Sequence, residues 1–282
     1  MTQYLVYDVF TDTVFGGNQL AVFPDAQDLP DNKLQDIAAE FNFSEVTFVY
    51  PPVNPDHSAK VRIFTPTSEV DFAGHPVIGT VIALSDLGYE APMVLELGVG
   101  PMPCDIENGF ASFTTSVPLE LFGQPDPALV ARALGLSERA IKTDIHPPQQ
   151  ASLGLPFVLV ELISREDLAV IATDVSAFRE GVKRYPTSLD FAIFTYVRGG
   201  QNISSRMFAP LDNIPEDPAT GSASAALAAM LTQIENAPLS LNFHQGEDMG
   251  RPSFISAKAQ PKPMSVTISG QAVKVMEGRF LG

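Results

Sequence analysis

Two stretches of the chain, RIFTPTSEVDFAGHPVIGT at residues 62–80 and RMFAPLDNIPEDPATGSAS at residues 206–224, repeat one pattern. Each begins with Arg-x-Phe-x-Pro and continues to Pro-x-x-Gly and a hydroxyl residue, with His75 in the first copy where the second has Asp217. An apolar helical segment follows both copies. The repeat predicts an α+β protein of two pseudo-symmetric lobes, each a curled, mostly antiparallel sheet around a central helix.

Proline and glycine indicate where the lobes and helices begin. Residues 116–128, SVPLELFGQPDPA, are rich in Pro, Gly and Asp and form the best candidate boundary. We expect an N-terminal lobe over residues 1–116 and a C-terminal lobe over residues 117–268. We expect Pro76 at the first position of its helix and Asp217-Pro218 at the opening of the other. In this alignment, His75 and Asp217 occupy equivalent positions in the two lobes. The repeat spacing predicts a connection two residues shorter in the second copy.

Composition limits the partners of the chain and its compartment. Its 282 residues include 33 acidic and 17 basic residues, a formal net charge of −16 that disfavours nucleic acid and anionic membrane surfaces. The single cysteine, Cys104, rules out an intrachain disulfide, and the four scattered histidines show no metal-ligand spacing. No secretory signal and no apolar stretch of about 20 residues is present, so we expect a soluble cytoplasmic protein without a metal.

The starts of the two repeated helices offer a site for a small acid. A helix N-terminus has backbone N–H groups without partners inside the helix and about half a positive charge, so it favours a carboxylate. Gly74 and Gly221 allow close approach to the backbone, and the hydroxyl of Ser222 adds a donor. A small acid held between two facing lobes would have each face of its reacting carbon next to a different lobe.

His75 and Asp217 are candidate site residues because unlike polar groups in the two copies suit a substrate that is not symmetric. Two simpler interpretations stay open at this point. Asp217 would cap its helix, and His75 would be a loop residue whose hydrogen bonds are satisfied within the protein.

Glu45 is the candidate proton carrier. It lies in FNFSEVTFVY between Phe43 and the segment Val46-Thr47-Phe48, and no basic residue is near it in the sequence. Apolar surroundings raise the pKa of a carboxyl group, which suits proton transfer near neutral pH. The alternative is an exposed glutamate at the edge of a strand.

Five blocks of sequence carry a family resemblance across nearly the whole chain. They are VYDVFTDTVFGGNQLAVF, NFSEVTFV, RIFTPTSEVDFAGHPVIGT, IPEDPATGSASAALAAML and HQGEDMGRPS. In this order they resemble the phenazine-biosynthesis PhzF-like family, which has the diaminopimelate-epimerase-like fold. The resemblance implies two lobes with the site between them, a terminal strand at residues 269–282 that returns to the N-terminal lobe, and a homodimer.

The resemblance also implies a reaction and the residues that perform it. The best-understood member isomerises a cyclic amino-acid-like acid, dihydro-hydroxyanthranilate, without a cofactor. Glu45 matches the glutamate that moves the proton in that family. His75 and Asp217 match the two residues that shape its site.

The predicted substrate-binding residues come from the same blocks. Backbone and hydroxyl groups that hold the substrate carboxylate in the family map to Gly74 and Ser222, and Gly221 adjoins the latter. Asn18 matches the family's Gly-Asn-Pro turn, in which Gln19 replaces the proline here. This departure concerns the geometry of the turn more than the chemistry.

Other functions fit the sequence less well. Racemases of the same fold use two thiols at the starts of these helices, but the loops here read FAGHP and EDPAT, and Cys104 lies in neither. No Gly-x-Ser-x-Gly hydrolase elbow, phosphate loop or dinucleotide motif is present. We predict a cofactor-independent isomerase of a small carboxylic acid. The alternative is a member of the same family that binds a small acid or a protein without catalysis.

Overall fold

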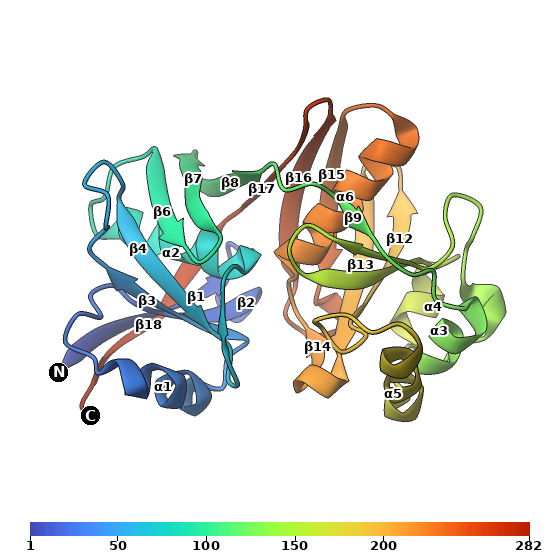
Figure 1. Cartoon of the computed structure of the whole chain (residues 1–282), viewed down its shortest axis with the longest axis horizontal. Helices are drawn as coiled ribbons and strands as arrows, with labels where there is room; N and C mark the ends of the chain where they lie inside the picture. Colours follow the sequence, from blue (N-terminus) through green and yellow to red (C-terminus); the bar gives the residue numbers. More distant parts are fainter. The chain divides into compact units, whose positions relative to one another are not determined.

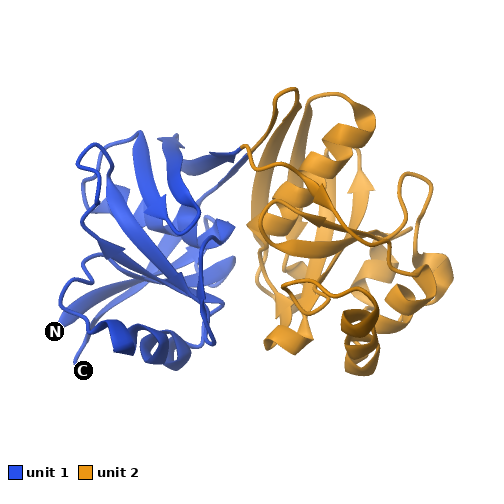
Figure 2. Cartoon of the chain, in the orientation of Figure 1, with its two compact units in different colours: residues 1–115, 267–282 blue, residues 116–266 orange.

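The computed structural model describes residues 1–282, which form two compact units: residues 1–115 with residues 267–282, and residues 116–266 (Figure 2). Both units combine helices with sheets that contain parallel and antiparallel pairs, so the predicted α+β class is confirmed. None of the helices has the length and apolar character that a membrane span requires.

The first unit is a mixed sheet with two α-helices (Figure 1). Its strands are β1 (Thr2–Val9), β2 (Asn18–Phe23), β3 (Glu45–Tyr50), β4 (Ala59–Phe64), β5 (Glu69–Val70), β6 (Met93–Leu97), β7 (Gly100–Glu107), β8 (Phe110–Thr115) and β18 (Ala272–Phe280). Its helices are η1 (Asp31–Lys33), α1 (Leu34–Phe41) and α2 (Gly74–Asp86). The pairs β18–β1 and β1–β2 are antiparallel, β2–β3 parallel, β3–β4 antiparallel, β4–β6 parallel and β6–β7 antiparallel.

The second unit also combines strands with helices, and it has more helices than the first unit. Its strands are β9 (Glu120–Leu121), β10 (Gln149–Ser152), β11 (Pro156–Glu161), β12 (Ile193–Gly199), β13 (Asn202–Ala209), β14 (Ile214–Asp217), β15 (Leu239–Gln245) and β16 (Ser253–Pro261). Its helices are α3 (Pro127–Ala133), η2 (Glu138–Ala140), α4 (Arg165–Ala169), α5 (Val175–Arg184), η3 (Pro210–Asp212), α6 (Gly221–Glu235) and η4 (Glu247–Met249). β17 (Met264–Gly270) spans the boundary between the two units.

The two units share one strand topology. The pairs β9–β10 and β10–β11 are antiparallel, β11–β12 parallel, β12–β13 antiparallel, β13–β15 parallel and β15–β16 antiparallel, which is the order found in the first unit. In both units a short strand, β5 or β14, pairs with the strand that carries Arg-x-Phe, and the central helix follows. The sequence repeat therefore corresponds to a repeat of topology.

The start of α2 differs from the sequence-based prediction. The helix begins at Gly74 after the N-cap residue Ala73, whose backbone is extended. His75 therefore lies inside the first turn, and Pro76 is the third helical residue and not the first. Proline is tolerated there because the N–H groups of the first turn have no partner within the helix.

The start of α6 corrects the register of the repeat. This helix begins at Gly221, and Asp217 is the last residue of β14 and lies well before the helix. By helix position, Gly221 corresponds to Gly74 and Ser222 to His75, so His75 and Asp217 are not equivalent. The connection is longer in the second unit, and not two residues shorter, because η3 and a longer β14 occupy it.

The central helices are buried on nearly all sides, which requires small residues where they contact the sheets. α2 packs on β1 and β2 through Gly79. A Cβ atom on Gly79 would lie 2.5 Å from Leu20 Cδ2 and 2.7 Å from Val9 Cγ2. The glycine thus lets the helix approach the start of β2, where the candidate site residues of this unit lie.

Candidate active site

Glu45 and His75 contact each other in the first unit. Glu45 is the first residue of β3, and its Oε2 lies 3.3 Å from Nδ1 of His75 in the first turn of α2. The side chains are 17% and 5% exposed, so Glu45 is not the exposed edge residue of the alternative interpretation. A carboxyl group and an imidazole far apart in the sequence thereby form one acid–base pair.

The protonation state of His75 follows from its surroundings. Nε2 lies 3.4 Å from the backbone carbonyl of Gln19, which can only accept, so Nε2 carries a proton and donates it. Burial lowers the pKa of His75 to about 3, and the hydrogen bond to Gln19 opposes this shift. The imidazole is therefore neutral at physiological pH, and its Nδ1 presents a lone pair to Glu45.

A neutral Nδ1 constrains the proton on Glu45. An ionised carboxylate oxygen and an imidazole lone pair repel each other at the 3.3 Å separation found here. The contact becomes favourable when Glu45 carries a proton and donates it to Nδ1. The contact can thus hold one exchangeable proton, which Glu45 carries and donates to Nδ1 of His75.

Asn18 belongs to the same group of residues because two parallel strands begin at one end of the sheet. Leu20 of β2 pairs with Glu45 of β3, which brings the first residues of β2 next to the turn before β3. Asn18 is buried, and its Oδ1 accepts a hydrogen bond of 3.2 Å from the Ser44 hydroxyl. Sequence reasoning did not predict Ser44 as a partner of Asn18, although Ser44 adjoins Glu45 in the quoted block.

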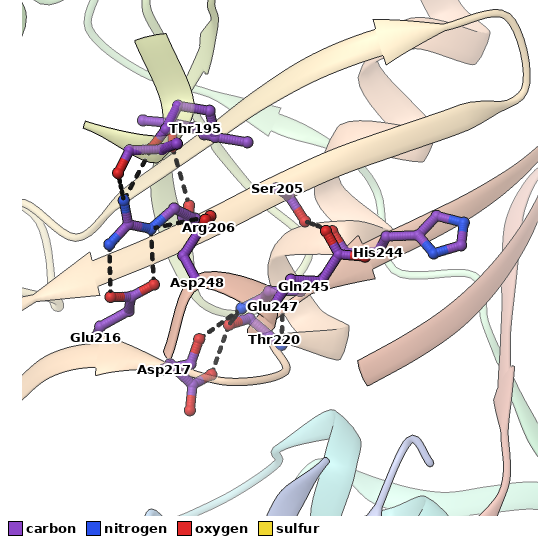
Figure 3. Close-up of polar contacts among 12 residues, drawn as sticks. Thr195, Ser205, Arg206, Glu216, Asp217, Thr220, His244, Gln245, Glu247 and Asp248 are labelled. Carbon is purple, nitrogen blue, oxygen red and sulfur yellow. Dashed lines mark hydrogen bonds and ion pairs between the residues drawn. The ribbon is translucent and has the colours of Figure 1, made fainter. Parts of the chain in front are cut away.

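Asp217 lies in a buried polar network of the second unit (Figure 3). Its Oδ2 accepts a hydrogen bond of 2.5 Å from the Thr220 hydroxyl. Gln245 Nε2 donates to the Asp217 carbonyl at 2.8 Å and to Thr220 Oγ1 at 2.9 Å, while Gln245 Oε1 accepts from the Thr220 backbone N–H at 3.1 Å. Thr220 and Gln245 were also missed from the sequence, although the fourth and fifth family blocks contain them.

The two helix starts keep the features expected of a carboxylate site. Gly74 opens α2, and Gly221 and Ser222 open α6. Neither helix has a side-chain hydrogen bond at its N-cap residue, Ala73 or Thr220. The side chain of the N-cap residue therefore does not cap either helix, and the partial positive charge of a helix N-terminus favours an anion.

The predicted residues thus form two groups, one in each unit. The first group contains Asn18, Glu45, Gly74 and His75. The second group contains Asp217, Gly221 and Ser222. Each group combines a helix N-terminus with a carboxyl group, half-buried for Glu45 and buried for Asp217, and such an arrangement is suited to binding a small acid and moving one of its protons.

Comparison with known proteins relates the whole chain to one family. The family model described as phenazine biosynthesis-like protein matches residues 7–278. An uncharacterized isomerase of Mesorhizobium japonicum is 38% identical over 98% of both chains. The trans-2,3-dihydro-3-hydroxyanthranilate isomerase of Pseudomonas fluorescens is 35% identical over 100% of both chains.

A solved structure supports the same fold. The crystal structure of the Bacillus anthracis phenazine biosynthesis protein of the PhzF family superposes with a TM-score of 0.86 over 99% of both chains, at 23% sequence identity. The activity is supported by the relatives that match over the whole chain, which are named as isomerases.

Proposed function

Because the chain belongs to the phenazine biosynthesis-like (PhzF) family, we propose that it isomerises a small cyclic or amino-acid-like carboxylic acid by proton transfer without a cofactor. The observation that carries this proposal is the contact between Glu45 and His75, which can hold a transferable proton. A relative that matches over 100% of both chains is named as a trans-2,3-dihydro-3-hydroxyanthranilate isomerase, which supports a substrate of this chemical class. Such a molecule carries a carboxylate, an amino group and a hydroxyl group on one ring.

Each candidate residue has a defined role in the proposal. The N–H groups at the starts of α2 and α6 and the Ser222 hydroxyl bind the substrate carboxylate. Asp217 accepts a hydrogen bond from the amino or hydroxyl group of the substrate, and its own orientation is held by Thr220.

Glu45 returns to its starting protonation state at the end of the reaction, so no further reactant is needed. Glu45 delivers the proton that it shares with His75 to one carbon of the substrate. The resulting carboxylate then removes a proton from a second carbon, the double bond moves between them, and Glu45 is again protonated. His75 remains neutral and accepts the hydrogen bond from Glu45 at the beginning and the end of the cycle.

The test replaces Glu45 by glutamine, which keeps the shape of the side chain but cannot carry the proton. With trans-2,3-dihydro-3-hydroxyanthranilate in D2O, the wild-type protein is expected to convert the acid and to introduce solvent deuterium, as followed by NMR. Glu45→Gln should lower turnover by roughly 100-fold or more. Glu40→Gln, at an exposed position of α1, is the matched control and should retain turnover.

Two outcomes would contradict the proposal. Turnover of Glu45→Gln at the wild-type rate would remove Glu45 from the mechanism. Saturable binding of small cyclic acids without deuterium incorporation into any of them would instead support a binding protein without catalysis.

A further inference from the structure

The arginine of the Arg-x-Phe repeat makes the same side-chain contacts in both units. Arg62 binds both carboxylate oxygens of Glu69, at 2.6 and 2.7 Å, through Nε and Nη2. Arg206 binds Glu216 through the same two nitrogens, both at 2.8 Å. In each unit the glutamate lies on the short strand, β5 or β14, that pairs with the arginine strand. We call each pair an arginine–glutamate fork.

An aromatic ring supports each fork. The guanidinium of Arg62 lies 5.1 Å from the ring centre of Phe64, and that of Arg206 lies 4.9 Å from the ring centre of Phe208. Planar guanidinium groups stack on aromatic rings and match carboxylates with two parallel hydrogen bonds. The repeated Arg-x-Phe thus specifies the geometry with which the short strand is held.

The fork of the second unit is the more buried and the more completely bonded. Arg206 is 9% exposed and Glu216 is 16% exposed. Nη1 of Arg206 also donates to the backbone carbonyls of Leu168 at 2.8 Å and Ala169 at 3.3 Å, at the end of α4. The guanidinium is therefore fixed from two sides and can act as a rigid anchor for β14.

Glu216 and Asp217 are neighbours on β14 and point to opposite sides. Consecutive side chains alternate across a strand, and Figure 3 shows Glu216 directed at Arg206 and Asp217 directed at Thr220. The ladder of β14 with β13 is irregular, because its register shifts between the pairs Met207–Asp217 and Ala209–Ile214. A short and irregular ladder holds a strand weakly, so the fork adds a constraint on β14 to the hydrogen bond between Gln245 and the Asp217 carbonyl.

We propose that Arg206 and Glu216 are positioning residues that fix the carboxylate of Asp217 for the substrate. This inference rests on the proposed function for the role of Asp217, but the placement of the carboxylate can be measured without a substrate. The fork acts through the backbone of β14: it fixes Glu216, and the adjacent Asp217 then meets the Thr220 hydroxyl at 2.5 Å.

The first test is structural and uses Glu216→Gln. A glutamine fills the same space but offers one oxygen acceptor in place of two, so it cannot form the fork. The matched control is Glu180→Gln, which removes the carboxylate of an exposed Arg132–Glu180 ion pair in the same unit. In crystal structures, Asp217 should lose its hydrogen bond to Thr220 in Glu216→Gln and keep it in the control.

An unchanged Asp217 carboxylate in Glu216→Gln would overturn the proposal. Should that variant fail to fold, Glu216→Asp keeps the charge and both oxygens on a side chain one methylene shorter. It should then show a displaced Asp217, and an undisplaced Asp217 would again refute the role of the fork.

The second test separates positioning from general destabilisation. With trans-2,3-dihydro-3-hydroxyanthranilate, Glu216→Gln should lower kcat roughly 10- to 100-fold with a smaller effect on KM, since misplacing a site group by about 1 Å has costs of this size. Combined with Asp217→Asn, it should cause no further loss. Equal fold losses in the wild-type and Asp217→Asn backgrounds would show that the fork does not act through Asp217. Wild-type turnover by Asp217→Asn would instead refute the role of Asp217 in the proposed function, and the crystal structures would still decide the role of the fork.

Discussion

Replacing Gly79 by alanine tests whether close packing of α2 on the sheet sets the position of His75. Gly79 lies one helical turn after His75, on the same face of α2. The added Cβ would lie 2.5 Å from Leu20 Cδ2 and 2.7 Å from Val9 Cγ2. Both neighbours are 0% exposed, so neither can turn out into solvent to make room.

Two opposing effects set the expected size of the change. Adding a methyl group to a filled core costs about 1–3 kcal/mol, whereas alanine is favoured over glycine inside a helix by about 1 kcal/mol. We therefore expect Gly79→Ala to lower the free energy of unfolding by about 1 kcal/mol and Tm by roughly 2–4 °C. The helix must also move away from β2, which lengthens the 3.4 Å contact of His75 Nε2 with the Gln19 carbonyl.

Thermal and urea unfolding followed by circular dichroism measure this loss directly. Ser85→Ala, at a half-buried position of the same helix, changes helix propensity without the clash and should be neutral or slightly stabilising. Turnover of Gly79→Ala should also fall at temperatures where the variant is fully folded. A Gly79→Ala protein that is more stable than the wild type would show that the core accommodates the methyl group and would refute the reasoning.

Two further predictions concern buried titratable groups. Burial raises the pKa of the Cys104 thiol to about 12, so the native protein should not react with a thiol reagent at about pH 8 until it is unfolded in guanidinium; prompt labelling of the native protein would contradict this. Burial lowers the pKa of His75 from 6.5 to about 3. Between pH 6.5 and about 3, His75 therefore binds a proton in the unfolded chain but not in the folded protein, and acidification favours unfolding. This effect lowers the free energy of unfolding by at most about 1.4 kcal/mol per pH unit. His75→Gln should therefore flatten the pH dependence of urea unfolding between about pH 6 and 4, and equal slopes for the two proteins would be inconsistent with a neutral buried His75.

The repeat that predicted the architecture also shows where sequence reasoning fails. Arg62 and Arg206 are truly equivalent, because both form a fork with a glutamate on the next strand. The match of Pro-x-x-Gly further along is not equivalent in structure, since Gly79 lies within α2 and Gly221 begins α6. Short turn motifs recur easily, whereas the position of a helix start depends on how the preceding connection packs.

The polar partners of the candidate residues could not be obtained from the sequence. Gln245 meets Asp217 and Thr220 because β15 ends beside the start of α6, and Ser44 meets Asn18 because β2 and β3 are parallel neighbours. Nothing in local composition states which strands pair or in which register. Both residues nevertheless lie in the blocks that carry the family resemblance.

By itself, the sequence determined the α+β class, the repeated lobes, the apolar central helices and the family, because these properties follow from local periodicity and from the order of motifs. Only the tertiary structure decided that Glu45 contacts His75, that His75 and Asp217 occupy different positions along their repeats, and that Arg206 holds the strand of Asp217. The physical reason is that hydrogen bonds and proton affinities depend on distances of a few ångström and on burial. Both are set by strand register and helix packing between segments far apart in the chain.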